Sequence, residues 1–198
     1  MMYKGIFSKT FDTANVDDNF RTIKALGYDA TQFNFASAGL PSLPETIEDH
    51  SIEEIAAAAR KHGVRIEAIS ATFNMTHPRQ SVIDKGMVSL AVICKAAARL
   101  DCPLVTLCTG TLDAEDQWRA HPDNNTPQAW QNICETMTQA LQIADRYNVS
   151  LGIEPELANI VNSAEKARQL LDEMQSERLK VIFDPANLFE VATLTVQH

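Results

Sequence analysis

The sequence predicts an α/β fold built on a parallel β-sheet, because short apolar runs alternate with longer helical patterns along the chain. The apolar runs span residues 3–8, 29–35, 64–72, 103–107, 149–153 and 179–183. Strict alternation of this kind is typical of parallel strands joined by right-handed crossovers. The chain has 198 residues, 45% of them hydrophobic, which allows a sizeable buried core, and we expect one domain over residues 1–198.

Start and stop signals support the first two predicted helices. The pattern over 16–26 is followed by Gly27, a residue suited to the left-handed conformation that ends many helices. The segment Ser51-Ile52-Glu53-Glu54 reads as a capping box, which predicts a helix start at Ser51. That helix is expected to reach His62 and to stop at Gly63.

The later helices rest on periodicity and on one further cap. Residues 80–100 place apolar side chains at helical steps of three and four, namely Ile83, Met87, Leu90, Cys94 and Ala97. Thr126-Pro127 predicts a helix that runs to Tyr147, with Thr as its cap and Pro in its first position. Another helix is expected over 163–174. A sixth pattern begins at 187–191, whereas 193–198 shows no clear pattern.

The spacing of the runs favours a (β/α)8 barrel over an open doubly wound sheet. The predicted strand starts are roughly 35 residues apart, so eight units would total roughly 280 residues, within the usual barrel range. No G-x-G-x-x-G motif follows the first run, which weakens the dinucleotide-binding alternative that an open sheet would suggest. The sequence therefore predicts an incomplete barrel with about six of the eight β/α units.

Composition argues against several classes of partner. The formal net charge is −9 and no basic cluster is present, so binding to nucleic acid or to an anionic membrane surface is not expected. No run of about 18 apolar residues predicts a membrane span, and residues 1–10 lack the features of a signal peptide. The expected location is cytoplasmic, with reduced and mostly buried thiols at Cys94, Cys102, Cys108 and Cys134.

Two carboxylates follow the fifth and sixth apolar runs directly. Glu154 and Asp184 are therefore expected at the carboxyl edge of the sheet, where active residues of α/β folds collect. Neighbouring strands lie about 4.8 Å apart, so both side chains can converge on one divalent cation. The alternative is that each only caps the loop or helix that follows it.

Other candidates lie in the loops after the same strands. His77 and Trp118 are candidate substrate contacts, but a loop His can equally be a surface residue and a loop Trp can equally fill a gap in packing. Glu156 either supports Glu154, faces substrate or is simply exposed. Glu67 lies inside the third run and is interpreted as an ion-paired residue or the polar end of a strand.

Four motifs in order resemble one known superfamily. They are FNMTHP at 73–78, CTGTLDAEDQWRAHPDNNTPQAW at 108–130, LGIEPE at 151–156 and VIFDPANLF at 181–189. Together they resemble the xylose isomerase-like TIM-barrel superfamily, and within it the sugar phosphate isomerase/epimerase group. The resemblance extends over nearly the whole chain up to about residue 189.

The resemblance implies an enzyme that binds a sugar or sugar phosphate and one divalent ion, Mn²⁺, Mg²⁺, Co²⁺ or Zn²⁺. In such enzymes the ligands are a Glu after the fifth strand, an Asp after the sixth, a His after the seventh and a Glu after the eighth. Glu154 and Asp184 match the first two, and the others would lie beyond His198. Asn187 stands where many epimerases carry a His that touches substrate.

The resemblance also implies a mechanism of proton transfer through an enediolate. The ion acts as a Lewis acid toward the sugar carbonyl and a neighbouring hydroxyl, while carboxylates remove and return the proton on the adjacent carbon. Glu154 is then both metal ligand and catalytic acid/base, and Asp184 is a metal ligand only. His77, Glu156, Asn187 and Trp118 are the expected substrate-binding residues.

An incomplete barrel leaves three interpretations of the chain. It is a fragment of a longer product, a short product that associates with another copy, or a shortened domain without turnover. We expect impaired or absent activity for the chain as given. Two alternative functions remain: non-catalytic binding of a sugar or partner, and a DNA-repair relative of endonuclease IV type, which the acidic charge disfavours.

Overall fold

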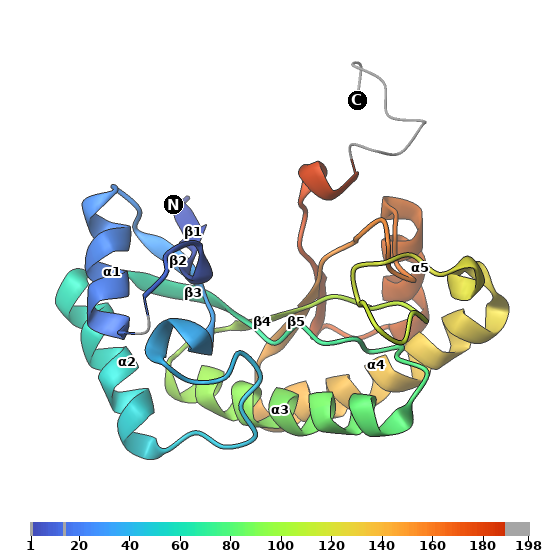
Figure 1. Cartoon of the computed structure of the whole chain (residues 1–198), viewed down its shortest axis with the longest axis horizontal. Helices are drawn as coiled ribbons and strands as arrows, with labels where there is room; N and C mark the ends of the chain where they lie inside the picture. Colours follow the sequence, from blue (N-terminus) through green and yellow to red (C-terminus); the bar gives the residue numbers. More distant parts are fainter. Residues whose placement is uncertain (1, 14, 189–198) are drawn as a thin grey trace. The chain divides into compact units, whose positions relative to one another are not determined.

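The computed structural model describes residues 2–13 and 15–188, and within them six strands form one sheet in the order β1-β2-β3-β4-β5-β6 (Figure 1). The strands are β1 (Gly5–Phe7), β2 (Ala30–Phe33), β3 (Arg65–Ser70), β4 (Leu104–Leu107), β5 (Ser150–Ile153) and β6 (Leu179–Val181). Strand order follows chain order without the reversal that marks a doubly wound sheet, which is the arrangement of a barrel. The predicted α/β fold with six of the eight barrel units is confirmed.

Five α-helices separate the strands, and most of their predicted ends are confirmed. They are α1 (Val16–Ala25), α2 (Asp49–His62), α3 (Gln80–Arg99), α4 (Pro127–Tyr147) and α5 (Ala164–Met174). Gly27 and Gly63 adopt positive φ angles of 81° and 61° directly after α1 and α2, as their positions predicted. The Thr126 hydroxyl accepts from the Ala129 N–H at 3.3 Å, which confirms the cap of α4.

The predicted capping box at Ser51 is wrong. Helix α2 begins at Asp49, its N-cap is Glu48, and no side chain makes a cap hydrogen bond there. The Ser51 and Ile52 N–H groups donate to the Glu48 carbonyl at 3.1 and 3.4 Å, so Ser51 is already inside the first turn. Asp49 at the helix start interacts favourably with the helix dipole, and this competes with the Ser51 signal.

Several strands are shorter than their apolar runs. Ser8, at the end of the first run, begins the 3-10 helix η1 (Ser8–Thr10), and Phe35 begins the 3-10 helix η2 (Phe35–Ala38). Of the sixth predicted helix start at 187–191, the structure describes only residues 187 and 188, which belong to the 3-10 helix η4 (Pro185–Leu188); residues 189–198 lie outside the described residues.

The described residues form two compact units, which we call the first and second units. The first unit comprises Met1–Ala71, Val88–Val105 and Tyr147–Val149. The second unit comprises Thr72–Met87, Thr106–Arg146 and the chain from Ser150 onward.

Packing in the first unit centres on three aromatic rings. Phe20 of α1 meets Phe33 of β2 edge-on at a centroid distance of 5.7 Å, and Phe33 meets Phe35 in the same way at 5.4 Å. Such pairs add roughly 0.5–1.5 kcal/mol beyond the burial of their area.

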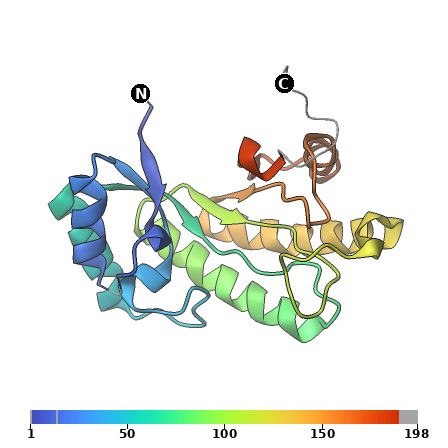
Figure 2. The same cartoon turned by 45° about the horizontal axis from the view of Figure 1, so that its top comes forward.

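Helices α1 and α2 lie side by side, as both Figure 1 and Figure 2 show. Strands β1, β2 and β3 pair in parallel, with a register shift between Thr31 and Gln32.

The second unit has its own apolar core. Helix α4 buries one stripe at helical spacing, made of Ala129, Ile133, Thr136, Met137, Ala140, Leu141 and Ala144. Leu107 at the end of β4 and Ile153 at the end of β5 are at most 1% exposed. This core supports the carboxyl ends of β4 and β5, from which the candidate site is built.

The four thiols are free, and three of them are buried as predicted. Burial raises the pKa of Cys94 to about 12, that of Cys102 to about 11 and that of Cys108 to about 12. A thiol with such a pKa is protonated at neutral pH and is a poor nucleophile or metal ligand. No described helix has the length and apolar character needed to cross a membrane.

Gly86 in helix α3 packs against the Phe73 ring, which leaves no room for a larger side chain at position 86. A Cβ at Gly86 would lie 2.1 Å from Cδ2 of Phe73, whose ring is only 3% exposed and has no solvent to move into. We expect Gly86→Ala to lower the free energy of unfolding by about 2 kcal/mol, because overpacking outweighs the roughly 1 kcal/mol gained in helix propensity. Urea unfolding measures the change.

Lys85→Ala is the matched control, since Lys85 is the exposed neighbour of Gly86 in the same helix. Its unfolding free energy should stay within about 0.5 kcal/mol of wild type. A Gly86→Ala variant that is as stable as wild type would show that Phe73 is not held in place.

Candidate functional site

The two predicted carboxylates lie beyond the carboxyl ends of neighbouring strands. Glu154 directly follows β5, and its N–H donates to the Leu107 carbonyl at 2.9 Å, which fixes its backbone. Asp184 follows β6 after two residues, because the strand ends at Val181. Burial raises the pKa of Glu154, and the Asp184 charge raises it further, so the two groups lie within electrostatic reach.

Asn187 is part of this group. Its Nδ2 donates to Oε1 of Glu154 at 2.8 Å, and this bond lowers the Glu154 pKa against the two raising effects. Asp184 also stabilises its own turn, since its Oδ1 accepts from the Ala186 N–H at 2.9 Å. The capping role that the sequence left open is therefore present at Asp184.

Glu156 is the third acid of the group. Burial raises its pKa to about 7, with further contributions from the charges of Glu154 and Asp184. Its backbone is held on both sides, because its N–H donates to the Val161 carbonyl at 3.2 Å and its carbonyl accepts from the Asn159 N–H at 2.9 Å. The sequence left the exposure of Glu156 open, and the structure places it half-buried beside Glu154.

His77 is used by the protein backbone at both ring nitrogens. Nδ1 accepts from the Arg79 N–H at 3.0 Å, which leaves Nε2 to donate to the Ala114 carbonyl at 3.1 Å. The ring is 9% exposed. His77 thus joins the loop after β3 to the loop after β4, and both of its nitrogens are already occupied.

Trp118 is exposed in the loop after β4. Trp118 is 53% exposed, and its backbone N–H donates to Oδ1 of Asp116 at 2.9 Å. Asp113 and Arg119 form a two-pronged ion pair beside it, at 2.6 and 2.8 Å. Within the described residues no hydrogen bond or ion pair connects His77 or Trp118 with the acids at Glu154, Glu156 and Asp184.

Sequence reasoning missed three buried asparagines, which we call the asparagine clasp (Asn74, Asn124 and Asn159). Three consecutive N–H groups each donate to one of them: Gly110 to Asn159 at 2.6 Å, Thr111 to Asn74 at 3.0 Å and Leu112 to Asn124 at 2.9 Å. Asn74 follows β3, Asn124 lies in the 3-10 helix η3 (Pro122–Asn125), and Asn159 follows β5. The clasp therefore ties three loops to one segment.

Further bonds complete this network. Asn74 Nδ2 donates to the Thr111 carbonyl at 2.8 Å, and Asn124 Nδ2 donates to the Ala158 carbonyl at 2.8 Å. Asn74 lies inside the FNMTHP motif and Asn124 inside the long polar loop, so both belong to segments that the sequence singled out. Their spacing in sequence carries no sign that they meet, because each partner lies more than ten residues away.

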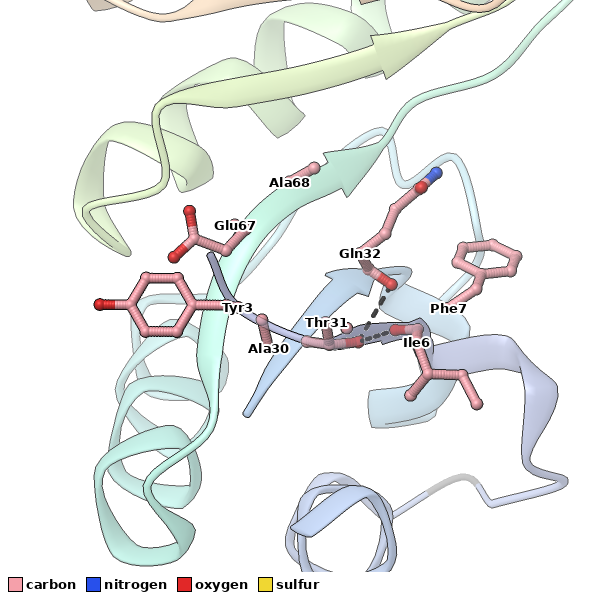
Figure 3. Close-up of a pocket in the computed structure, with 9 residues that line it drawn as sticks. Tyr3, Ile6, Phe7, Ala30, Thr31, Gln32, Glu67 and Ala68 are labelled. Atoms are coloured by element: carbon pink, nitrogen blue, oxygen red, sulfur yellow. Dashed lines mark hydrogen bonds between the residues drawn. The ribbon is translucent and has the colours of Figure 1, made fainter. Parts of the chain in front are cut away.

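The first unit contains a separate cavity of about 400 Å³ along β1, β2 and β3 (Figure 3). Tyr3 and Glu67 lie on its wall, and Thr31 Oγ1 donates to the Ile6 carbonyl at 2.8 Å. Glu67 forms an ion pair with Arg65 at 2.5 Å, one of the two interpretations that the sequence left open. No motif from the sequence falls in this cavity, so it is not part of the candidate site.

The donors for a metal ion are incomplete in the described part of the chain. No three His, Cys, Asp or Glu side chains there lie close enough together to hold an ion. Glu154, Asp184 and Asn187 offer hard oxygen donors, the type preferred by Mg²⁺ and Mn²⁺.

The sequence profile of the xylose isomerase-like TIM barrel family matches residues 20–195. The chain belongs to this family. Comparison of the sequence with curated proteins returns no match.

Solved structures show the same fold at low identity. The 3-keto-D-glucoside 4-epimerase of E. coli shares 17% identity at a TM-score of 0.70, over 91% of this chain and 67% of that chain. A D-allulose 3-epimerase from Methylomonas sp. shares 13% at 0.75, over 97% and 66%. A family protein from Mycobacterium smegmatis in complex with magnesium shares 14% at 0.72, over 96% and 66%. The chain thus spans about two thirds of the length of these relatives, in keeping with six β/α units.

Gly110, whose N–H donates to the clasp, is constrained both by its backbone conformation and by a close neighbour. Its φ is +75°, and a Cβ there would lie 2.1 Å from Oδ1 of Asn74. We expect Gly110→Ala to lower the free energy of unfolding by about 3 kcal/mol, because left-handed strain adds to the loss of buried hydrogen bonds. Thermal or urea unfolding measures this loss.

Gly63→Ala is the matched control, since Gly63 has a φ of +61° and nothing within 4 Å of its added Cβ. It should lose only about 1 kcal/mol, the strain alone. Equal losses for the two variants would mean that Asn74 yields without consequence.

Proposed function

We propose that this chain carries part of a divalent-metal-dependent isomerase or epimerase for a sugar or sugar phosphate. The observation that carries the proposal is the group of three acids at the carboxyl ends of β5 and β6 in a barrel of this family. Burial raises the pKa of both Glu154 and Glu156; the Asp184 charge raises both further, and the Glu154 charge also raises the pKa of Glu156, so negative charges repel one another in this group. A bound cation would relieve this repulsion.

The residues present fit such an ion as a partial ligand set. Glu154 and Asp184 would hold it, and the missing ligands would come from outside the described residues. When bound, the ion supplies Lewis-acid polarisation of a carbonyl on the substrate. Zinc- and magnesium-bound relatives support the choice of a divalent ion, and its identity stays open among Mn²⁺, Mg²⁺, Co²⁺ and Zn²⁺.

The chain's own residues supply proton transfer and orientation. Glu154 is proposed to take the proton from the carbon beside the sugar carbonyl, since burial favours its neutral form and so strengthens it as a base. Asn187 holds the Glu154 carboxylate through its Oε1 at 2.8 Å, which fixes the direction in which the other oxygen points. Glu156, Asn187, Trp118 and His77 are the proposed substrate-binding residues. Trp118 is available for stacking, and His77 would contact substrate through its ring carbons, because both of its nitrogens bond to backbone groups.

The protein around this site is proposed to be cytoplasmic and to act on small molecules rather than nucleic acid. Four free thiols are typical of a reducing compartment, and the net charge of −9 disfavours a phosphate backbone. Association with a further copy is the proposed route by which the chain itself would gain missing ligands. If it does not associate, binding without turnover is the expected behaviour.

A calorimetric titration of the metal-stripped chain with Mn²⁺ tests the site. We expect saturable one-site binding that weakens about 100-fold or more in Glu154→Gln and in Asp184→Asn, since each removes a charged ligand. Glu135→Gln is the matched control, because Glu135 is exposed on α4 and should not alter the affinity. Affinity like that of wild type in both site variants would refute the assignment.

Deuterium exchange on candidate ketoses in D₂O, followed by NMR with Mn²⁺ present, then tests proton transfer. Exchange at the carbon beside the carbonyl, lost in Glu154→Gln, is the expected result for a catalytic chain. Mn²⁺ binding without any exchange would instead support the binding role.

A further inference from the structure

The turn that carries Glu154 and Glu156 is held by residues of the asparagine clasp. Asn159 N–H donates to the Glu156 carbonyl at 2.9 Å, and Asn124 Nδ2 donates to the carbonyl of Ala158, one residue before Asn159, at 2.8 Å. The turn from Glu154 to Asn159 is therefore held from two directions. Neither contact is made by a residue that touches a carboxylate oxygen.

The clasp is closed to solvent. Asn74 is 5% exposed, Asn124 is 4% exposed and Asn159 is fully buried. A buried amide must find partners for both its oxygen and its nitrogen, so each asparagine permits only a narrow range of loop positions. Asn159 Nδ2 has no partner among the described residues, while its Oδ1 is bound at 2.6 Å to the Gly110 N–H. The Gly110 contact thus fixes the amide orientation even at the expense of the other end.

Asn124 joins the loop after β4 to the loop after β5. Its Oδ1 accepts from the Leu112 N–H, its Nδ2 donates to Ala158, and Thr111 Oγ1 lies 3.0 Å from the same Nδ2. Thr111 Oγ1 in turn donates to the carbonyl of Arg119, the residue after Trp118, at 3.0 Å. One side chain thereby connects the Glu154–Glu156 turn with the loop that carries Trp118.

We propose that Asn124 is a positioning residue, which makes the Trp118 loop and the Glu154–Glu156 turn one rigid rim and so presents the acids to a cation. The inference rests on the proposed function, since it concerns the same carboxylates. It adds that part of the cation affinity resides in an amide that never touches the cation. Outer contacts of this kind typically alter metal affinity about 10–100-fold.

Hydrogen exchange of backbone amides tests the rigid rim in the full chain. In Asn124→Ala we expect the amides of Leu112 and of residues 156–161 to exchange about tenfold faster or more, because both loops lose the contact that joins them. Asn132→Ala is the matched control, since in the described part of the chain the Asn132 side chain bonds only to Gln128 of its own helix. Unchanged exchange at 156–161 in Asn124→Ala overturns the proposal.

Mn²⁺ affinity, measured on the same variants, separates positioning from mere structural support. Positioning predicts about tenfold weaker binding in Asn124→Ala with saturation at the same stoichiometry, and no change in Asn132→Ala. Faster exchange with wild-type affinity would mean that the rim is structural only, and this also overturns the proposal. A wild-type chain that binds no Mn²⁺ counts against the proposed function, and the exchange pattern then decides the rigid rim alone.

Thr111→Val serves if Asn124→Ala does not fold. It keeps the volume and removes only the hydroxyl that contacts Asn124 and the Arg119 carbonyl. Exchange should rise in the loop around Trp118 by about threefold, a smaller effect than that of Asn124→Ala because the bond to Ala158 remains. Exchange equal to wild type in that loop would contradict the proposal.

Discussion

Three backbone N–H groups, those of residues 110–112, set the arrangement of the loops in the second unit. The chain leaves β4 there and turns through a left-handed glycine, so the strand no longer supplies acceptors for these donors. Buried donors without acceptors are costly, and side chains from three different loops provide the oxygens. The N–H groups in the loop after β4 therefore fix the positions of the loops after β3 and β5, which supply acceptors for them.

The candidate site combines this rigidity with electrostatic crowding. The charges of Glu154, Glu156 and Asp184 interact, and within the described residues Glu154 accepts a hydrogen bond from Asn187, which carries no charge. Such an arrangement is unfavourable in the folded chain alone. Proteins keep unfavourable charge clusters mainly where function requires them, as with clustered carboxylates that bind cations. The electrostatic argument and the family relationship therefore support the same proposal from separate observations.

Periodicity and local signals predicted most of the fold. Apolar runs located all six strands, Gly27 and Gly63 marked helix ends, and Thr126 capped α4, because each of these effects operates within a few residues. The helix start at Ser51 failed for the same reason, since a nearby local signal at Asp49 competed with it. Strand ends were overestimated where Ser8 and Phe35 turn into 3-10 helices that serve loop packing.

The site was only partly accessible from sequence. Glu154 and Asp184 were proposed because position after a strand is itself informative, and the same motifs supplied Glu156 and Asn187 as candidates. The clasp was not, because hydrogen bonds between loops depend on which strands are neighbours. His77 was likewise marked as a candidate substrate contact, but nothing in the sequence showed that both of its ring nitrogens would bond to backbone groups.

The two constrained glycines differ in how evolution can change them. At Gly86 the nearest obstacle is the Phe73 ring, so a smaller residue at position 73 is expected to make room for alanine. At Gly110 a smaller partner at position 74 would remove the steric clash, but the left-handed backbone would remain and the Thr111 N–H would lose its acceptor. A second substitution at position 73 can thus compensate for alanine at position 86, whereas no substitution at position 74 can compensate for alanine at position 110. In related chains we expect the residues at 73 and 86 to change together, and Asn at 74 and Gly at 110 to be retained together.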